Sequence, residues 1–148
     1  MAYKLSEAKD PLNIAEREYA SRQNKIQFTA ITSCIGVVAK KGAKLTGVHL
    51  SMLDDKDKYF GADPKNDVAN VLKQLPNPAD QVTIFGWIED WRNAKHSNDT
   101  VAAAYLDLTG QLKGRVGKGL KLYHEGMRVD GTYSAEIDGD GILITKVV

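Results

Sequence analysis

The clearest pattern of apolar and polar positions lies between residues 26 and 50. From residue 26 to residue 31 apolar side chains largely alternate with polar ones, which is the periodicity of a β-strand. Residues 35–40 and 43–50 are rich in valine and other strand formers, and Lys41-Gly42 between them is typical of a two-residue turn. We therefore predict a β-hairpin over these residues, preceded by a strand that leads into Cys34.

Two segments begin with Asp-Pro, in which the aspartate can serve as an N-cap and proline is favoured at the first helical position. After Asp10-Pro11, apolar residues recur at helical spacing, which predicts a helix over about residues 11–22. After Asp63-Pro64, one apolar helical face is followed by Pro76-Asn77-Pro78, which predicts a second helix that ends near Leu75.

The rest of the chain reads mostly as strand. The predicted strands are 82–88, 101–108, 120–124, 129–137 and 142–147, with a turn at Asp138-Gly139-Asp140-Gly141 between the last two. The expected fold class is α+β, in which a mostly antiparallel β-sheet or sandwich packs with one or two helices. We expect a single catalytic domain over residues 1–148, with residues 1–24 as an N-terminal helical extension.

Composition narrows the classes of partner and cofactor. The chain has 43% hydrophobic and 26% charged residues with a net charge of +1, which is ordinary for a globular protein and gives no reason to expect binding to nucleic acid or insertion into a membrane. The N-terminus lacks the apolar core of a cleavable signal peptide, so we expect synthesis in the cytosol. One cysteine and three dispersed histidines fit no structural zinc pattern.

The predicted hairpin brings the single cysteine close to a histidine. With Lys41-Gly42 as the turn, Gly36 would face Gly47 and Cys34 would face His49 on the same side of the sheet. Directly opposed Cβ atoms lie about 4.5–5.5 Å apart, which allows a hydrogen bond between sulfur and imidazole. The opposed glycines would either leave an access path to the sulfur for substrate or mark a bend.

A paired thiol and imidazole predict nucleophilic chemistry. An adjacent imidazolium lowers the pKa of a thiol, and the thiolate can attack a carboxamide carbon. The backbone N–H groups of Ser33 and Cys34 are the expected donors to an oxyanion. Thr29, Thr32 or a backbone carbonyl would orient the imidazole. The competing interpretation is that Cys34 is a small buried apolar residue.

Residues 32–42, followed by His49, resemble the active-site hairpin of the cytotoxic necrotizing factor catalytic domain and of relatives such as the chemoreceptor glutamine deamidase CheD. The resemblance implies a sandwich of helices and strands, no metal or organic cofactor, and deamidation of a glutamine in a protein substrate. It makes Cys34 the nucleophile and His49 the base. The toxins place glycine where Ser33 stands, and the threonine that relatives carry six residues before the cysteine has Thr29 as its nearest counterpart.

The resemblance leaves two biological settings open. A chemotaxis enzyme modifies receptors of its own cell, whereas a toxin-like effector is secreted or delivered into a target cell and modifies a regulatory protein such as a small GTPase; we favour the effector. Two further functions stay open, a non-catalytic protein-interaction domain and another thiol hydrolase, either a peptidase or a transglutaminase-like enzyme. His96 and His124 receive no catalytic role.

Overall fold

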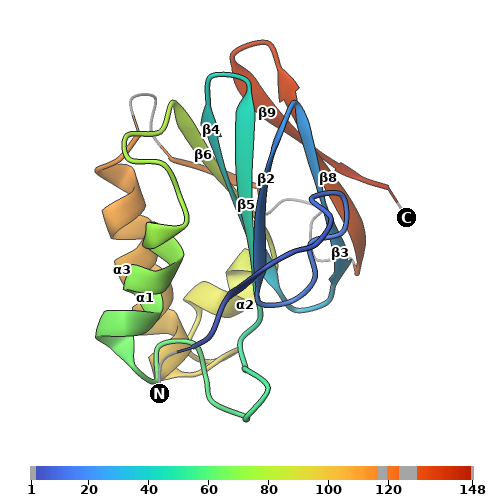
Figure 1. Cartoon of the computed structure of the whole chain (residues 1–148). Helices are drawn as coiled ribbons and strands as arrows, with labels where there is room; N and C mark the ends of the chain where they lie inside the picture. The colour runs from blue at the N-terminus through green and yellow to red at the C-terminus, as the bar shows by residue number, and fades with distance from the viewer. Residues whose placement is uncertain (1–2, 117–119, 124–129, 148) are drawn as a thin grey trace.

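The computed structural model describes residues 3–116, 120–123 and 130–147, which form three layers (Figure 1). Helices α1 (Pro64–Lys73) and α3 (Asp99–Lys113) cover one face of a six-stranded sheet, with the short helix α2 (Ile88–Arg92) packed against α3. A three-stranded sheet covers the opposite face. The predicted α+β sandwich is therefore confirmed.

The larger sheet has the strand order β1-β2-β5-β4-β6-β7. Its central hairpin is antiparallel, whereas β1 and β7 pair in parallel with their neighbours at the two edges. The smaller sheet is antiparallel and has the order β3-β8-β9. The strands are β1 (Ser6–Glu7), β2 (Glu18–Gln23), β3 (Lys25–Ile31), β4 (Ile35–Lys41), β5 (Lys44–Leu50), β6 (Gln81–Gly86), β7 (Leu120–Tyr123), β8 (Gly131–Asp138) and β9 (Gly141–Lys146).

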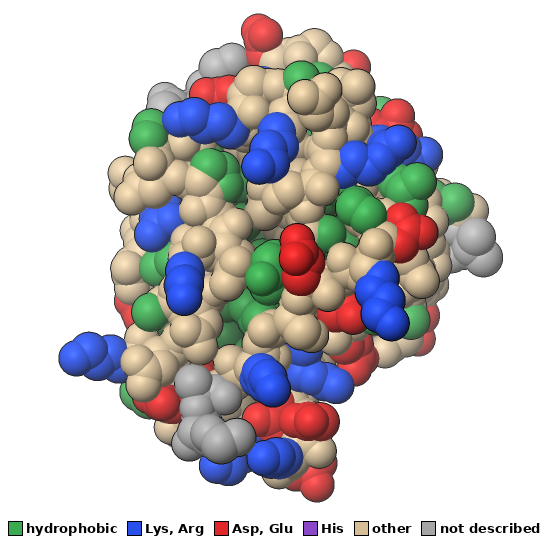
Figure 2. Space-filling model, viewed as in Figure 1, with side chains coloured by type: hydrophobic (Ala, Val, Ile, Leu, Met, Phe, Trp, Pro, Cys, Tyr) green, Lys and Arg blue, Asp and Glu red, His purple; other side chains and the backbone are tan. Residues whose placement is uncertain are grey.

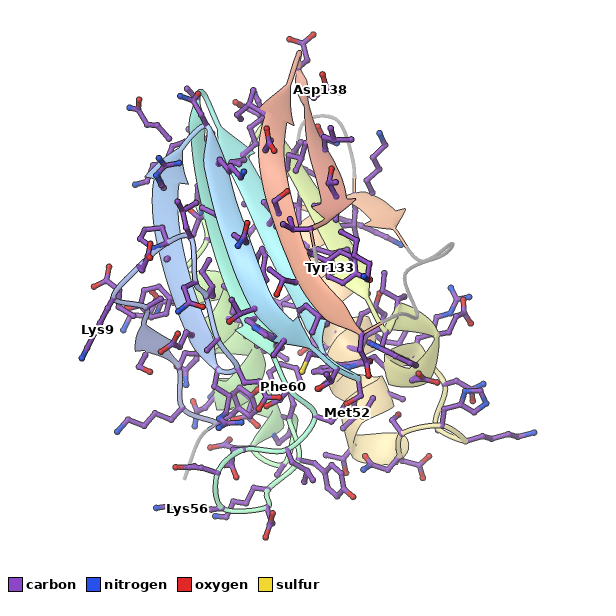
Figure 3. The ribbon with its side chains drawn as sticks, turned by 90° about the vertical axis from the view of Figure 1, so that its right-hand side faces the viewer. Lys9, Met52, Lys56, Phe60, Tyr133 and Asp138 are labelled. Atoms are coloured by element: carbon purple, nitrogen blue, oxygen red, sulfur yellow. The ribbon has the colours of Figure 1, made fainter. Side chains whose placement is uncertain are left out.

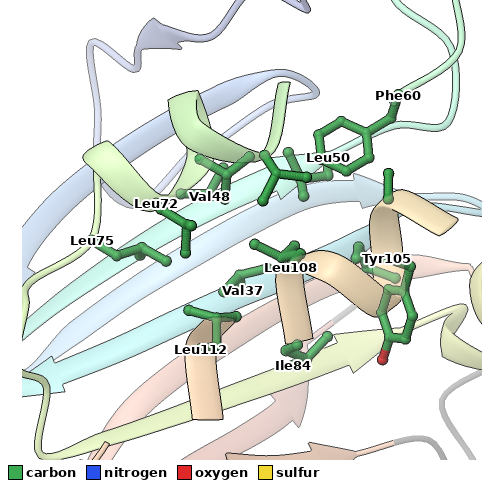
Figure 4. Packing of buried hydrophobic residues seen from close by; sticks show 14 of the residues in the cluster. Val37, Val48, Leu50, Phe60, Leu72, Leu75, Ile84, Tyr105, Leu108 and Leu112 are labelled. Atoms are coloured by element: carbon green, nitrogen blue, oxygen red, sulfur yellow. The ribbon is translucent and has the colours of Figure 1, made fainter. Parts of the chain in front are cut away.

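The central strands contribute to two separate hydrophobic cores. Val37, Val48 and Ile84 pack beneath the helices, as Figure 4 shows. The alternate residues, among them Val38 and Phe85, pack against the smaller sheet instead. Because both faces of β4 are covered, its sequence is apolar without alternation from Ile35 to Ala39. Cys34 belongs to the second core, between the two sheets.

The predicted N-terminal helix is wrong. In the described part of residues 1–24 the chain forms turns and the strands β1 and β2, and β2 pairs with β5. The carboxylate of Asp10 accepts a hydrogen bond from the N–H of Leu12 at 2.9 Å, which closes a local turn of the kind that aspartate favours. Asp-Pro thus begins a turn here, and this segment belongs to the sandwich rather than extending from it.

The strand predicted over residues 101–108 is also wrong, because these residues lie within α3. The side chain of Asn98 accepts a hydrogen bond from the N–H of Val101 at 2.8 Å and caps the helix. The buried positions of α3 recur at helical spacing. The helix after Asp63 is confirmed as α1, and the other predicted strands correspond to β6, β7, β8 and β9; His124 and Val129 lie outside the described residues.

The surface carries charges of both signs. Lysine and arginine side chains are interspersed with aspartate and glutamate on the face shown in Figure 2. Among the described residues, no helix is both long enough and apolar enough to cross a bilayer.

Candidate active site

Cys34 lies in the short connection between β3 and β4, where the backbone is tightly fixed. Ser33 has φ 57°, a left-handed conformation that glycine adopts more readily than serine. The indole Nε1 of Trp91 donates to the carbonyl of Ser33 at 2.9 Å, and the N–H of Trp87 donates to the carbonyl of Cys34 at 3.0 Å. The conformation that a glycine before the cysteine would favour is therefore present here with serine in that place.

The register of the hairpin differs from the predicted one by two residues. Lys41 pairs with Lys44 around a Gly42-Ala43 turn, so Gly36 faces His49. The predicted direct opposition of Cys34 and His49, and that of Gly36 and Gly47, is wrong. Because a shift of two residues preserves the face of each side chain, Cys34 and His49 still lie on the same side of the sheet, as diagonal rather than direct neighbours.

The two glycines do not open a path to the sulfur. A Cβ on Gly36 would lie 2.3 Å from the ring of Phe85. A Cβ on Gly47 would lie 2.5 Å from both Ile26 and Phe28. The predicted role of Gly36 and Gly47 in substrate access is therefore wrong, and they instead let the side chains of the smaller sheet and of β6 approach the hairpin closely.

His49 is completely buried and oriented by the main chain. Its Nδ1 lies 3.0 Å from the carbonyl oxygen of Ile14, and because a carbonyl can only accept, Nδ1 carries the proton. Burial lowers the pKa of His49, so the ring is neutral at neutral pH. Its Nε2 is buried and has no hydrogen-bond partner within the described part of the chain. This nitrogen is thus an unoccupied proton acceptor, and no hydrogen bond joins it to the thiol.

The backbone carbonyl of Ile14 takes the orienting role for which Thr29 was a candidate. The N–H of Thr29 donates to the same carbonyl oxygen at 3.0 Å, so Thr29 contributes through its main chain. No described residue forms a hydrogen bond with the Thr29 hydroxyl. Of the three orienting groups that the sequence left open, the backbone carbonyl is the one in contact with the imidazole.

Cys34 is held as a thiol. Its side chain is 1% exposed, and Sγ donates to the carbonyl of Thr32 at 3.2 Å and lies 3.5 Å from Oε1 of Glu16. Burial raises the pKa of Cys34 to about 12, and the Glu16 carboxylate contributes to the rise. The expected lowering of this pKa by an imidazolium is therefore contradicted, because the adjacent histidine is neutral and the nearest charge is negative.

A cavity of about 370 Å³ reaches Cys34. It opens near the end of the sandwich where Met52 follows β5, opposite the end that carries Asp138 (Figure 3). Cys34 contributes to its wall. No described residue accepts a hydrogen bond from the backbone N–H of Ser33 or of Cys34. The lining residues are Glu16, Ser33, Cys34, Ser51, Met52, Leu53, Tyr59, His96 and Ser97.

Two groups at this cavity were not predicted from the sequence. Glu16 is brought to Cys34 by the turn before β2, where the N–H of Arg17 donates to the carbonyl of His49 at 2.8 Å. His96 lies at the cavity with Nδ1 3.0 Å from the carboxylate of Asp90. No local signal could reveal Glu16, because its segment was assigned to a helix and its contacts are distant in sequence.

No protein-family model matches the chain, and it has no significant match among curated proteins.

Proposed function

We propose that this protein is a cysteine-dependent amidohydrolase that deamidates a glutamine side chain of a protein substrate. The observation that carries the proposal is the combination of a thiol in the wall of a cavity with a neutral imidazole on the same sheet face, whose free Nε2 is set to accept a proton. The resemblance of residues 32–49 to the deamidase hairpin supports the choice of a carboxamide as the substrate group.

The arrangement favours attack by a thiol with base assistance over attack by a preformed thiolate. His49 would take the proton of Cys34 as sulfur bonds to the carboxamide carbon, which requires a local rotation to bring Nε2 and Sγ together. The backbone N–H groups of Ser33 and Cys34 would donate to the oxyanion. Ile14 would hold the tautomer throughout, since its carbonyl keeps the proton on Nδ1.

The remaining steps restore the enzyme. The imidazolium gives its proton to the departing nitrogen, the C–N bond breaks and ammonia leaves a thioester on Cys34. Water, deprotonated by His49, then adds to the thioester; the C–S bond breaks, the thiol regains a proton and the glutamine has become glutamate. The sum consumes one water and releases ammonia without any redox change.

A protein substrate is supported by the rim of the cavity. Leu53 is 38% exposed and Tyr59 is 43% exposed, and both line the opening. Exposed apolar and aromatic side chains beside a cavity suit contact with another protein surface. The substrate class follows the resemblance and is a regulatory protein such as a small GTPase, modified by an effector delivered into a target cell.

A second candidate, a non-catalytic interaction domain, is favoured by the burial and the raised pKa of Cys34. In that case the cysteine is a core residue, and only the exposed rim is functional. A peptidase or transglutaminase-like activity on the same pair would also use the thioester, and it differs in the product that is released.

The test is incubation of the purified protein with a cell extract, followed by mass spectrometry of the tryptic peptides and assay of free ammonia. We expect glutamine-to-glutamate conversion at a restricted set of sites, abolished in Cys34→Ser and reduced at least about a hundredfold in His49→Asn. Serine can keep the hydrogen bond to Thr32, and asparagine can keep a donor toward Ile14, so both variants should fold.

Each alternative has its own signature. Cleaved or cross-linked peptides in place of deamidated ones would indicate the other thiol hydrolases. An extract left unchanged by the wild type, together with a native thiol that iodoacetamide does not modify, would reject the enzyme in favour of the interaction domain.

A further inference from the structure

The carboxylate of Glu16 occupies the position beside the sulfur at the mouth of the cavity. Its Oε1 lies 3.5 Å from Sγ of Cys34, and its Oε2 lies 3.3 Å from Nη1 of Arg17. The side chain of Glu16 is 42% exposed, so it borders both the solvent and the thiol. A group that enters from solvent to reach the sulfur therefore meets this carboxylate.

We propose that Glu16 is the specificity-determining residue of the site, which selects a primary carboxamide by accepting a hydrogen bond from its NH₂ group and disfavours the carboxylate product. The inference rests on the proposed function and adds a recognition element to it. It assigns a role to a residue outside the thiol, imidazole and oxyanion donors.

The geometry of attack places the amide nitrogen near Glu16. A carbon about to react lies within about 3–3.5 Å of the nucleophile, so the two heteroatoms bonded to it lie close to the partners of Sγ. The carbonyl oxygen is expected at the N–H groups of Ser33 and Cys34, where the oxyanion forms. Two acceptors contact the sulfur, the Thr32 carbonyl and the Glu16 carboxylate, and of these only Glu16 is among the residues that line the cavity. The nitrogen of a substrate in the cavity then faces the Glu16 carboxylate.

The hydrogen-bonding inventory fits this assignment. A primary amide nitrogen offers two donors and no acceptor, and an ionised carboxylate offers only acceptors. After hydrolysis, a carboxylate oxygen of the product replaces the amide nitrogen. This oxygen cannot donate a hydrogen bond, and its negative charge is repelled by the Glu16 carboxylate. The same contact that favours binding of the amide would thus promote release of the acid.

Arg17 helps to fix this carboxylate without entering the cavity wall. Its guanidinium contacts Oε2 of Glu16, Oγ of Ser51 at 3.1 Å and the carbonyl of Leu53 at 3.3 Å. Because Oε2 is engaged in this way, Oε1 is the oxygen directed at the thiol. When substrate is bound, the amide N–H would replace the S–H as the partner of Oε1.

Two alkylating reagents that differ only in this group provide the test. Iodoacetamide carries a primary amide and iodoacetate carries a carboxylate, and Cys34 is the single cysteine of the chain. The ratio of their alkylation rates, measured at one pH, cancels the thiolate fraction. The same ratio in the urea-unfolded chain supplies the intrinsic preference of the reagents. We expect the native protein to favour iodoacetamide by about tenfold more than the unfolded chain does.

The matched variants are Glu16→Gln and Glu18→Gln. Glutamine at position 16 removes the charge beside the sulfur, so the preference should fall to that of the unfolded chain. Glutamine at position 18 removes a charge two residues away, yet it can still accept the hydrogen bond from Ala15 at 2.9 Å, so the preference should persist. An equal ratio in the wild type and in Glu16→Gln would overturn the role of Glu16 while leaving the deamidase intact; native Cys34 that resists both reagents would overturn both proposals.

Discussion

At the scale of single residues, the surroundings of Cys34 place it at a cavity but do not ionise its thiol. Cys34 lines a cavity, but burial and a nearby carboxylate keep its thiol protonated. In the proposed mechanism, activation therefore falls to His49, which is neutral and has a buried Nε2 with no partner among the described residues. The proposed site would work like a serine hydrolase, with the proton transferred during attack rather than before it.

The raised pKa predicts the pH profile of Cys34 alkylation. Because only the thiolate reacts and the pKa is about 12, the iodoacetamide rate should still rise about tenfold per pH unit between pH 8 and pH 10. The urea-unfolded chain should instead level off above about pH 9, near the ordinary pKa of a thiol. Alkylation quenched at a series of times and followed by mass spectrometry measures both curves. A native profile that levels off near neutral pH would contradict the rise in the pKa of Cys34 on burial.

Gly86 holds the backbone of Cys34 from the opposite side. It has φ 105°, and an added Cβ would lie 2.5 Å from the carbonyl oxygen of Cys34. Gly86→Ala should therefore lower the free energy of unfolding by about 2–4 kcal/mol, through backbone strain and a clash that displaces Cys34. Urea denaturation measures the loss.

Gly139→Ala is the matched control, because Gly139 has φ 60° and open space around its Cβ position. It should lower the free energy of unfolding by only about 1 kcal/mol, from backbone strain alone. Equal losses in the two variants would show that the contact with Cys34 carries no extra cost.

At the scale of elements, the segment before β2 contacts both residues of the candidate pair. Ile14 contacts His49 through its carbonyl, Glu16 contacts Cys34, and the N–H of Arg17 donates to the carbonyl of His49. Three successive contacts thus come from a segment of four residues that has no regular secondary structure of its own before β2 begins. The candidate site is assembled from the connection between β3 and β4, from β5 and from this segment together.

A second set of hydrogen bonds joins the chain before β1 to α1. Asp67 is 1% exposed and accepts hydrogen bonds from the N–H groups of Tyr3, Gly61 and Asp63 at 2.6, 2.9 and 3.2 Å. Asp67→Ala should cost about 3 kcal/mol of unfolding free energy, because buried N–H groups lose their acceptor.

Asp63→Ala controls for the loss of a carboxylate at the same end of the helix. The Asp63 side chain is half-buried and makes no capping bond to the backbone, and its partner is the side chain of Asn66, so this change should cost less than about 1 kcal/mol. Thermal or urea unfolding compares the two variants. Similar losses would mean that Asp67 contributes as a surface charge rather than as a buried acceptor.

What the sequence could predict at this scale depended on local signals. The helix after Asp63 was predicted because an N-cap position, a periodic apolar face and a terminating proline coincide. The same Asp-Pro pair at residues 10–11 misled, since an aspartate turn and a helix N-cap use the same side chain. The alanine-rich start of α3 was mistaken for a strand because its helical spacing is masked by small residues.

The candidate pair was found despite a wrong register. Gly42 is compatible with either of two adjacent turns, and the choice shifted the pairing by two residues. The period of two in a strand kept Cys34 and His49 on one face, although no hydrogen bond joins the two described side chains. Glu16, Ile14 and the cavity could not be predicted, because they depend on contacts between segments that only the folded chain brings together.

At the scale of the whole molecule, the two cores have different tasks. The core between the larger sheet and the helices contains no candidate catalytic residue, whereas the core between the two sheets contains Cys34 and the ring of Phe28 that packs against His49. The smaller sheet thus excludes solvent from the imidazole of His49, and this burial lowers its pKa and keeps the ring neutral. The helices support the larger sheet from the other side.

This division predicts where local opening occurs. Phe28 is fully buried in the core between the two sheets, and Phe60 is fully buried in the core between the larger sheet and the helices. Phe28→Ala and Phe60→Ala should each cost about 3–5 kcal/mol. Hydrogen exchange should accelerate mainly in β8 and β9 for the first variant and mainly in α1 and α3 for the second. Uniform acceleration in both variants would indicate one cooperative unit instead of two cores.

The acceptor that orients His49 is an atom that every amino acid supplies. Replacement of Ile14 would change the packing of its side chain and still leave a carbonyl 3.0 Å from Nδ1, provided that the main chain keeps its path. Alanine at position 14 would therefore act through the packing of a fully buried side chain and would leave the orienting acceptor in place. The tautomer of the proposed base is thus set by the path of the backbone at residue 14 rather than by the chemistry of a side chain.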